Sequence, residues 1–167
     1  MGLAAVADAG PLIHLSEVGG LDLLGQFEPL YIPDAVWEES RRHMREGLES
    51  PEGWFILQTV GKEAEEAFRR AHSLEGLQRG ECTALYLCLA LKVGIVLTDD
   101  LAARRAAERL GLRAVGSIGI VARGCRLGMI TLEQAEVLLW GLYRESSLFV
   151  TSVIVELALE ELRKALR

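Results

Sequence analysis

Acidic residues placed after apolar runs carry the clearest chemical signal in this chain. Only five of its acidic residues are Asp, against 19 Glu, and three of those five follow two short apolar segments. Asp8 follows residues 4–7, and the adjacent Asp99 and Asp100 follow residues 94–98. Two adjacent carboxylates repel each other, and a divalent cation offsets that repulsion because hard cations prefer oxygen ligands. The pattern predicts a site for Mg²⁺ or Mn²⁺.

Two glutamates could complete such a site. Glu81 opens an apolar helix, and Glu39 lies beside Glu38 on an earlier helix. Each has a simpler interpretation, because the helix dipole stabilises an acid in the first turn and a Glu pair can form a solvated face. The Asp residues could likewise cap the helices that follow them. The residues alone leave these alternatives open.

Hydrophobic periodicity and helix start signals predict alternating strands and helices. Strands are expected at residues 4–7, 30–32, 54–60, 94–97 and 112–115. Helices are expected at residues 11–18, 21–27, 33–45, 62–72, 81–92, 101–110, 118–128, 131–145 and 148–166. This alternation predicts an α/β fold with three layers, α/β/α, around a central, mainly parallel sheet of four to five strands. Ligands bind such sheets beyond the carboxyl ends of the strands, where Asp8, Asp99 and Asp100 are expected.

The chain shows no linker, repeat or low-complexity stretch, which predicts a single domain over residues 1–167. The predicted C-terminal helices, at about residues 131–166, should pack on the core or on a dimer partner. The last helix has a broad apolar face formed by Val150, Val153, Ile154, Leu157 and Leu162. A face of this kind must be covered by the chain's own core or by another subunit.

Composition narrows the possible functions. The net charge of −6 argues against sequence-independent adhesion to nucleic acid, although Arg residues, which suit phosphate contact, far outnumber the three Lys. Three Cys and the lack of a long apolar run predict a cytoplasmic protein without membrane spans. P-loop, G-x-G-x-x-G, C-x-x-C, H-E-x-x-H and G-x-S-x-G motifs are absent from the sequence. His14, on an apolar helix, is interpreted as a structural residue rather than a ligand.

Four segments, in order, resemble those of PIN domains. They are V-A-D-A-G-P-L-I-H-L at 6–15, I-P-D-A-V-W-E-E at 32–39, R-G-E-C-T-A-L at 79–85 and V-L-T-D-D-L-A-A-R at 96–104. The segment V-G-S-I-G-I-V-A-R-G at 115–124 and the final two helices are similar to the toxin-like (VapC-type) ribonuclease branch of that family. The resemblance covers nearly the whole chain.

The resemblance implies a set of catalytic acids. These are Asp8, Glu39, Glu81, Asp99 and Asp100, with metal ligands expected among Asp8, Glu81, Asp99 and Asp100. The spacing from Val36 selects Glu39 over Glu38. The T-x-D spacing of relatives favours Asp100, whereas Asp99 is the first residue after the strand. Many PIN domains place a further acid after the last strand, and the nearest position here is Ser117.

The implied function is a Mg²⁺- or Mn²⁺-dependent endoribonuclease that hydrolyses RNA phosphodiester bonds. Relatives in the toxin-like branch imply the toxin of a toxin–antitoxin pair, a homodimer and a small antitoxin protein as inhibitor. Substrate contacts are expected from Thr98, Arg104, Arg105 and Ser117. The alternative is a non-catalytic PIN-like module that binds RNA or protein. A haloacid-type phosphatase is less favoured, because it needs D-x-D where this chain has Asp8-Ala9-Gly10.

Overall fold

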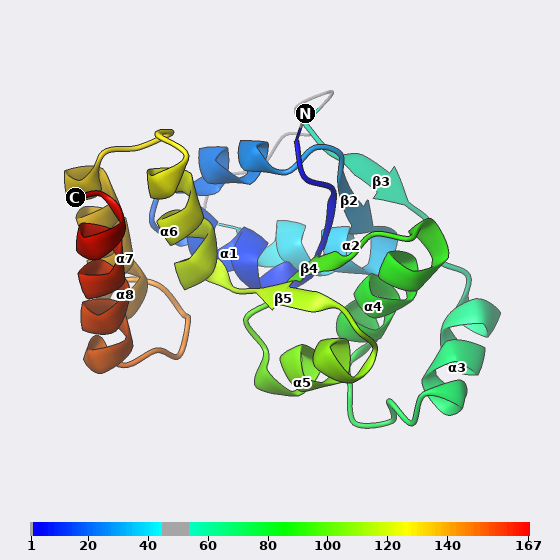
Figure 1. The fold of residues 1–167 in the computed structure, drawn as a ribbon. Helices are drawn as coiled ribbons and strands as arrows, with labels where there is room; N and C mark the ends of the chain where they lie inside the picture. Colours follow the sequence, from blue (N-terminus) through cyan, green and yellow to red (C-terminus); the bar gives the residue numbers. More distant parts are fainter. Residues whose placement is uncertain (1, 45–53) are drawn as a thin grey trace.

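A five-stranded parallel sheet organises the computed structural model, which describes residues 2–44 and 54–167 (Figure 1). The strands are β1 (Ala5–Ala7), β2 (Leu30–Pro33), β3 (Ile56–Gln58), β4 (Ile95–Leu97) and β5 (Arg113–Val115). Their order across the sheet is β3-β2-β1-β4-β5, and every neighbouring pair is parallel. The two strands followed by Asp residues, β1 and β4, are therefore adjacent.

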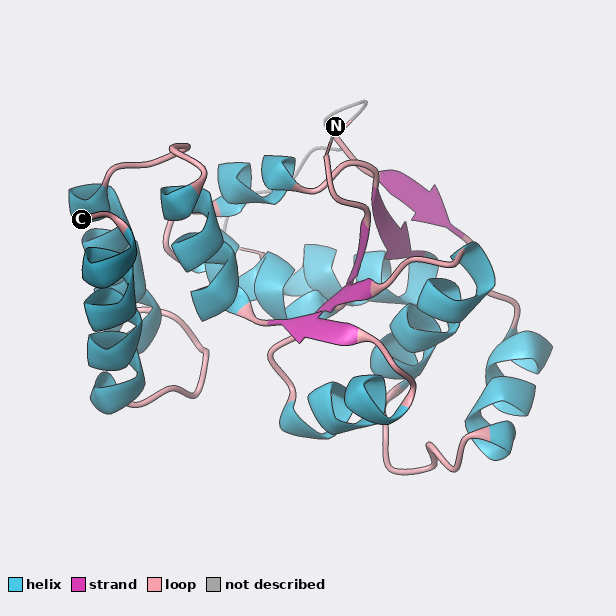
Figure 2. Cartoon of the chain, in the orientation of Figure 1, coloured by secondary structure: helices cyan, strands magenta, loops and turns pink. Residues whose placement is uncertain are grey.

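Helices connect the strands and cover both faces of the sheet (Figure 2). They are α1 (Ala9–Glu17), the 3₁₀ helix η1 (Leu21–Gln26), α2 (Asp34–His43), α3 (Lys62–Ala71), α4 (Arg79–Leu91), α5 (Leu101–Arg109), α6 (Ser117–Arg126), α7 (Leu132–Arg144) and α8 (Ser152–Ala165). One face packs against α3, α4 and α5, and the other against α1, η1 and α6. The predicted α/β/α fold is confirmed.

The central strands are buried on both faces because they are wholly apolar. Val6 pairs in register with Val96, and both side chains pack against α4 and α5. Their strand neighbours, such as Ala7 and Leu97, point to the opposite face and join the core beneath α1 and α6. This alternation with period two is what a strand between two helical layers requires.

The predicted element boundaries hold to within a few residues. The largest difference is in the last helix, which begins at Ser152 rather than near residue 148. The third strand is limited to Ile56–Gln58, and the first helix begins at Ala9 rather than near Pro11. Pro11 fits inside the first turn of α1, since a proline there loses no helical hydrogen bond. The predicted helix end near Arg45 lies outside the described residues.

The C-terminal hairpin of α7 and α8 packs against α6 at one end of the molecule (Figure 1). Leu139, Leu142 and Leu162 are fully buried in this contact, so part of the predicted apolar face of the last helix is covered by the chain itself. Val153 and Leu157 on α8 remain more than half exposed, at 59% and 55%. Within the described residues, no helix combines the length and apolarity needed to cross a membrane.

Candidate functional site

The five predicted acids line one hollow at the carboxyl edge of the sheet. Asp8 follows β1, and Asp99 and Asp100 follow the adjacent β4, so the parallel pairing brings them to the same edge. Helices α2 and α4 contribute Glu39 and Glu81. The hollow has a volume of about 280 Å³, and its lining also includes Gly10, His14, Gln78, Leu148 and Phe149.

Asp8 is buried behind the surface of this hollow and is held by two hydrogen bonds. Its side chain is only 5% exposed. Oδ1 accepts a hydrogen bond from the Ala9 backbone N–H at 2.8 Å, and Oδ2 accepts one from the Thr98 hydroxyl at 2.8 Å. Burial raises the pKa of Asp8 to about 6, and the charges of Glu39 and Asp100 add to that rise against the two hydrogen bonds.

Glu81 has one engaged oxygen and one free oxygen. Its Oε1 accepts a hydrogen bond from the Gln78 backbone N–H at 3.1 Å and so caps the start of α4. Its Oε2 is buried and has no hydrogen-bond partner among the described residues. Burial raises the pKa of Glu81 to about 7, against the lowering effect of the Gln78 hydrogen bond. The negative charges of Asp8 and Asp100 and a side-chain interaction with Asp100 add to the rise. A buried carboxylate oxygen without a donor is costly unless a cation or proton compensates it.

The two adjacent Asp residues have different environments. Asp99 is held from three directions: Oδ1 accepts from the Ser117 N–H at 2.7 Å, and Oδ2 lies 2.5 Å from the Ser117 hydroxyl and 2.7 Å from His14 Nδ1. Asp100 caps α5 through a hydrogen bond from the Ala103 N–H to Oδ2, at 2.8 Å. Its charge raises the pKa of both Asp8 and Glu81, which places Asp100 electrostatically with those two acids.

Glu39, rather than its neighbour, faces the hollow. Glu38 is exposed and lies 3.8 Å from Arg41 in an ion pair on the outer surface of α2. The approach of α2 to α4 is close at Gly80, where a Cβ would lie 3.1 Å from Glu39 Oε2 and 3.7 Å from Asp8 Oδ1. Those two carboxylate oxygens therefore share one small space that a larger side chain at position 80 would invade.

The four residues predicted to contact substrate lie in different environments. Thr98 and Ser117 are fully buried and donate hydrogen bonds to Asp8 and Asp99, so their contact with a substrate stays a prediction. Arg105 is exposed on α5 and lines neither this hollow nor its neighbour. Arg104 reaches the sheet edge, where its Nη1 donates to the Thr98 carbonyl at 3.4 Å. These different environments follow from side-chain direction, which the spacing of residues in the chain does not specify.

Sequence reasoning missed the three polar or aromatic residues that line the hollow beside the acids. His14 was interpreted as structural, yet it contacts Asp99 and lines the site; it stands six positions after Asp8, a spacing that gives no helical-face signal. Gln78 precedes Glu81 by three residues, and that spacing, typical of a capping box, could have indicated the contact. Phe149 lies in the loop before α8, and no local pattern links it to the acids.

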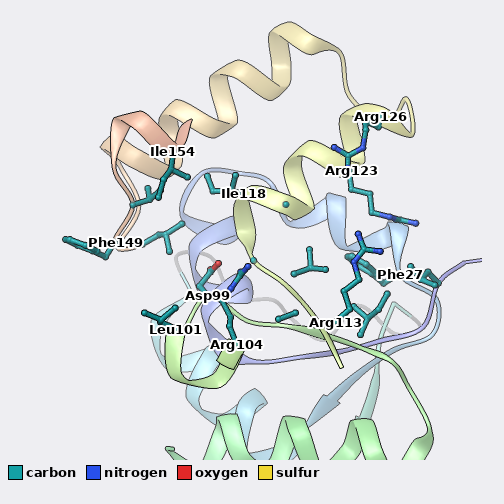
Figure 3. Close-up of a pocket in the computed structure, with 18 residues that line it drawn as sticks. Phe27, Asp99, Leu101, Arg104, Arg113, Ile118, Arg123, Arg126, Phe149 and Ile154 are labelled. Atoms are coloured by element: carbon teal, nitrogen blue, oxygen red, sulfur yellow. The ribbon is translucent and has the colours of Figure 1, made fainter. Parts of the chain in front are cut away.

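A second hollow adjoins the first along β5 (Figure 3). Its volume is about 480 Å³, and it shares Asp99, Leu148 and Phe149 with the carboxylate hollow. Its walls combine apolar side chains from α6, from α8 and from Phe27, which follows η1, with four arginines, Arg104, Arg113, Arg123 and Arg126. The acids at the carboxyl edge of the sheet are therefore flanked by a basic hollow that extends along β5 to its first residue, Arg113.

The acids fit a hard cation by their chemistry. The donors are carboxylate oxygens, one of them, Glu81 Oε2, buried and unpartnered. Within residues 2–44 and 54–167, no three His, Cys, Asp or Glu side chains are already grouped to hold a metal ion. Mutual repulsion of the acids is consistent with such spacing, since among the described residues only His14 lies within ion-pair distance of one of them, Asp99. Binding of an ion therefore requires these side chains to draw together.

Comparison with known proteins gave one match. A family model described as a PIN domain matches residues 4–164. This range includes all five acids and every residue that lines the two hollows, except Leu3. Searches of curated proteins and of solved structures found no match.

Proposed function

Because this chain belongs to the PIN-domain family, whose members are typically nucleases, we propose that it is a divalent-metal-dependent endoribonuclease. The observation that carries the proposal is the convergence of Asp8, Glu39, Glu81, Asp99 and Asp100 on one hollow, from four separate elements. The unpartnered Glu81 Oε2 supports it, because that oxygen is available to a ligand.

Asp8, Glu81 and Asp100 are the proposed ligands of Mg²⁺ or Mn²⁺, with Glu39 completing the set. The charges of Glu39 and Asp100 raise the pKa of Asp8, and those of Asp8 and Asp100 raise the pKa of Glu81, as expected for groups that share a site. Asp99 is proposed as a positioning residue, since Ser117 and His14 already engage both of its oxygens. When bound, the cation supplies Lewis-acid activation of water and charge compensation at the phosphoryl group.

The protein's own residues hold these ligands in place. Thr98 fixes the orientation of Asp8 through its hydroxyl, and the Ala9 N–H fixes the other oxygen of the same carboxylate. Ser117 links Asp99 to the start of α6 through its backbone and its hydroxyl. Two residues without charge thereby restrict two acids, which reduces the conformational freedom lost when a ligand binds.

The acidic hollow should repel RNA until a cation neutralises it. Five carboxylates around about 280 Å³ present concentrated negative charge to an incoming phosphate. RNA binding as well as cleavage should therefore require a divalent ion, and a chelator should abolish both.

The test is cleavage of a mixture of RNAs by the purified protein with Mn²⁺, compared with its Asp8→Asn variant. Asn keeps the shape of the side chain but removes the charge, so we expect at least a ~100-fold loss of rate, about 2.7 kcal/mol in transition-state stabilisation. Glu38→Gln is the matched control, because Glu38 lies on the outer face of α2, and it should cleave at the wild-type rate. Circular dichroism checks that both variants are folded.

The outcomes separate the proposal from its alternative. Undiminished cleavage by Asp8→Asn would show that another site is responsible. RNA binding without cleavage by the wild-type protein, with Mg²⁺ or Mn²⁺, would favour a non-catalytic RNA-binding module. Neither result would alter the family assignment, which rests on the match over residues 4–164.

The resemblance to the toxin-like branch also supports a proposal for the cellular role of the protein. We propose a toxin of a toxin–antitoxin pair that acts as a homodimer in the cytoplasm and is inhibited by a small antitoxin protein. Three buried free cysteines, Cys82, Cys88 and Cys125, suit a reducing compartment. The exposed apolar side chains of α8 support a dimer.

A further inference from the structure

The basic hollow beside the acids has no role in holding the metal. It runs along β5, from Phe149 and Leu101 at the end near Asp99 to Phe27, Arg113 and Arg123 at the other (Figure 3). At about 480 Å³ it is the larger of the two hollows, within the range of about 300–1,000 Å³ that is common for ligand sites. A polymer leaving the acids on this side would enter it.

Arginines without carboxylate partners line this hollow. Among the described residues, Arg104, Arg113, Arg123 and Arg126 form no ion pair, although the chain carries 24 acidic residues and a net charge of −6. Arg123 is held by a 2.9 Å hydrogen bond to Gln26 Oε1 and lies over the Phe27 ring, at 5.5 Å from its centroid. Guanidinium groups left free of carboxylates suit phosphate oxygens.

Phe149 stands where the two hollows meet. Its side chain is 96% exposed, so it contributes almost nothing to the core. The loop that carries it is nevertheless held in place, because the N–H and hydroxyl of Ser147 donate to Glu17 Oε1 at 3.0 and 2.7 Å. The fold therefore presents an aromatic face to solvent directly beside the acids.

We propose that Phe149 is a base-stacking residue and that the arginine-lined hollow binds the backbone of a single-stranded RNA substrate. The inference rests on the proposed function, since it places the scissile phosphate at the acids. An unpaired base can stack on an aromatic ring, whereas a base inside a duplex already stacks on neighbouring bases on both faces. The arrangement therefore selects single-stranded over double-stranded RNA.

An acidic protein segment is the competing occupant of an arginine-lined hollow. It fits less well, because the hollow shares Asp99 and Phe149 with a cluster of five carboxylates that would repel it. An RNA chain meets the same repulsion, but the cation that the acids bind removes it for a phosphate that must reach them. Because the arginine-lined hollow continues into the acidic one, RNA is favoured over an acidic protein segment as its occupant.

The test is fluorescence anisotropy with a labelled single-stranded RNA and its duplex, in Ca²⁺, with gels confirming that the RNA stays intact. Base–aromatic stacking contributes roughly 1–3 kcal/mol, so Phe149→Ala should weaken binding of the single strand by roughly 5- to 150-fold. Phe149→Trp should retain it. Val137→Ala is the control, since Val137 is 72% exposed on α7 and lines neither hollow, and it should bind like wild type.

The backbone contact has its own measurement. Arg113→Ala should weaken binding of all RNA sequences and lower by about one the slope of log affinity against log salt concentration. Arg109→Ala, on an exposed part of α5 outside the hollow, should change neither.

Equal affinity of Phe149→Ala and wild type for the single strand would overturn the proposal, as would preference for the duplex. If the protein binds RNA with these losses but never cleaves it with Mn²⁺, the nuclease assignment fails and the stacking assignment stands.

Discussion

At the scale of single residues, three acids of the hollow also cap helices. Asp8, Glu81 and Asp100 each accept a backbone N–H at the start of α1, α4 and α5. The capping interpretation of Asp8 and Asp100 is therefore confirmed. Glu81, expected only to interact with the helix dipole, caps α4 as well. Capping does not compete with a role in the site, because a carboxylate has two oxygens. The two oxygens of Glu81 differ in this way: Oε1 caps the helix, and Oε2 has no hydrogen-bond partner among the described residues.

Burial of Glu81 gives a prediction about pH. The folded state raises the pKa of this carboxyl from its ordinary value of 4.5 to about 7, so the folded protein holds the proton more tightly than the unfolded chain does. The resulting stability is fully present below about pH 4.5 and is lost as pH rises through 7. Without metal, wild type should lose thermal stability between pH 5 and 8, and Glu81→Gln should lose less.

Thermal denaturation in EDTA at several pH values provides the measurement. At pH 8 the Gln variant should melt higher than wild type by roughly 2–4 °C, the change that about 1 kcal/mol produces in a chain of this size. Near pH 4.5 the two should be alike. Parallel pH profiles for the two proteins would contradict the assignment of Glu81 as a buried, poorly compensated acid.

At the scale of elements, the site depends on how closely α2 approaches α4. Gly80 lies at the contact, and a Cβ there would be 3.5 Å from Val36 as well as 3.1 Å from Glu39 Oε2. The contact at 3.1 Å is tight, so the Glu39 carboxylate must move if position 80 carries a side chain. Glycine at this position allows the acids from two helices to share one space.

The variant Gly80→Ala tests this packing. Ala favours a helix over Gly by roughly 0.5–1 kcal/mol, so the melting temperature should stay level or rise. Displacement of Glu39 should nevertheless reduce Mn²⁺ affinity by roughly tenfold, or about 1.4 kcal/mol, in an isothermal titration. Gly76→Ala is the control, since a Cβ there meets nothing within 4 Å. Unchanged Mn²⁺ affinity in Gly80→Ala would exclude Glu39 from the metal site.

At the scale of the whole molecule, the C-terminal hairpin covers α6 with one side and leaves the other exposed. Val155, Leu159 and Leu162 of α8 are buried in the core, whereas Val153 and Leu157 are more than half exposed. Exposed apolar side chains gathered on one helix are typical of an interface. The proposed homodimer would use this side of α8.

A charge on that side should separate the dimer. Leu157→Glu should shift the mass measured by light scattering from dimer to monomer at micromolar concentration, because burying an unpaired carboxylate in an interface is strongly unfavourable. Leu127→Glu, at an exposed position after α6, should leave the mass unchanged. A monomeric wild-type protein at the same concentration would remove the dimer from the proposal.

The sequence alone determined the alternation of elements and the edge at which the acids meet. Apolar runs such as Ile95–Leu97 are too short for helices and too apolar for a solvated face, so they predict buried parallel strands. Parallel strands end at a common edge, and that rule placed Asp8 near Asp99 and Asp100 before any coordinates. Helix caps are local, so they too could be predicted from neighbouring residues.

Only the tertiary structure decided what each side chain faces. Three features depend on how helices pack across the sheet. Thr98 and Ser117 are buried, and His14 contacts Asp99. Glu38 points outward, whereas its neighbour Glu39 faces the hollow. The contact of His14 with Asp99 joins residues 85 positions apart, and chain spacing does not encode the rotation of one helix against another. Phe149 lies in a loop without periodicity, so its place beside the acids follows from the packing of α7 and α8 on α6 and from the hydrogen bonds of Ser147 to Glu17.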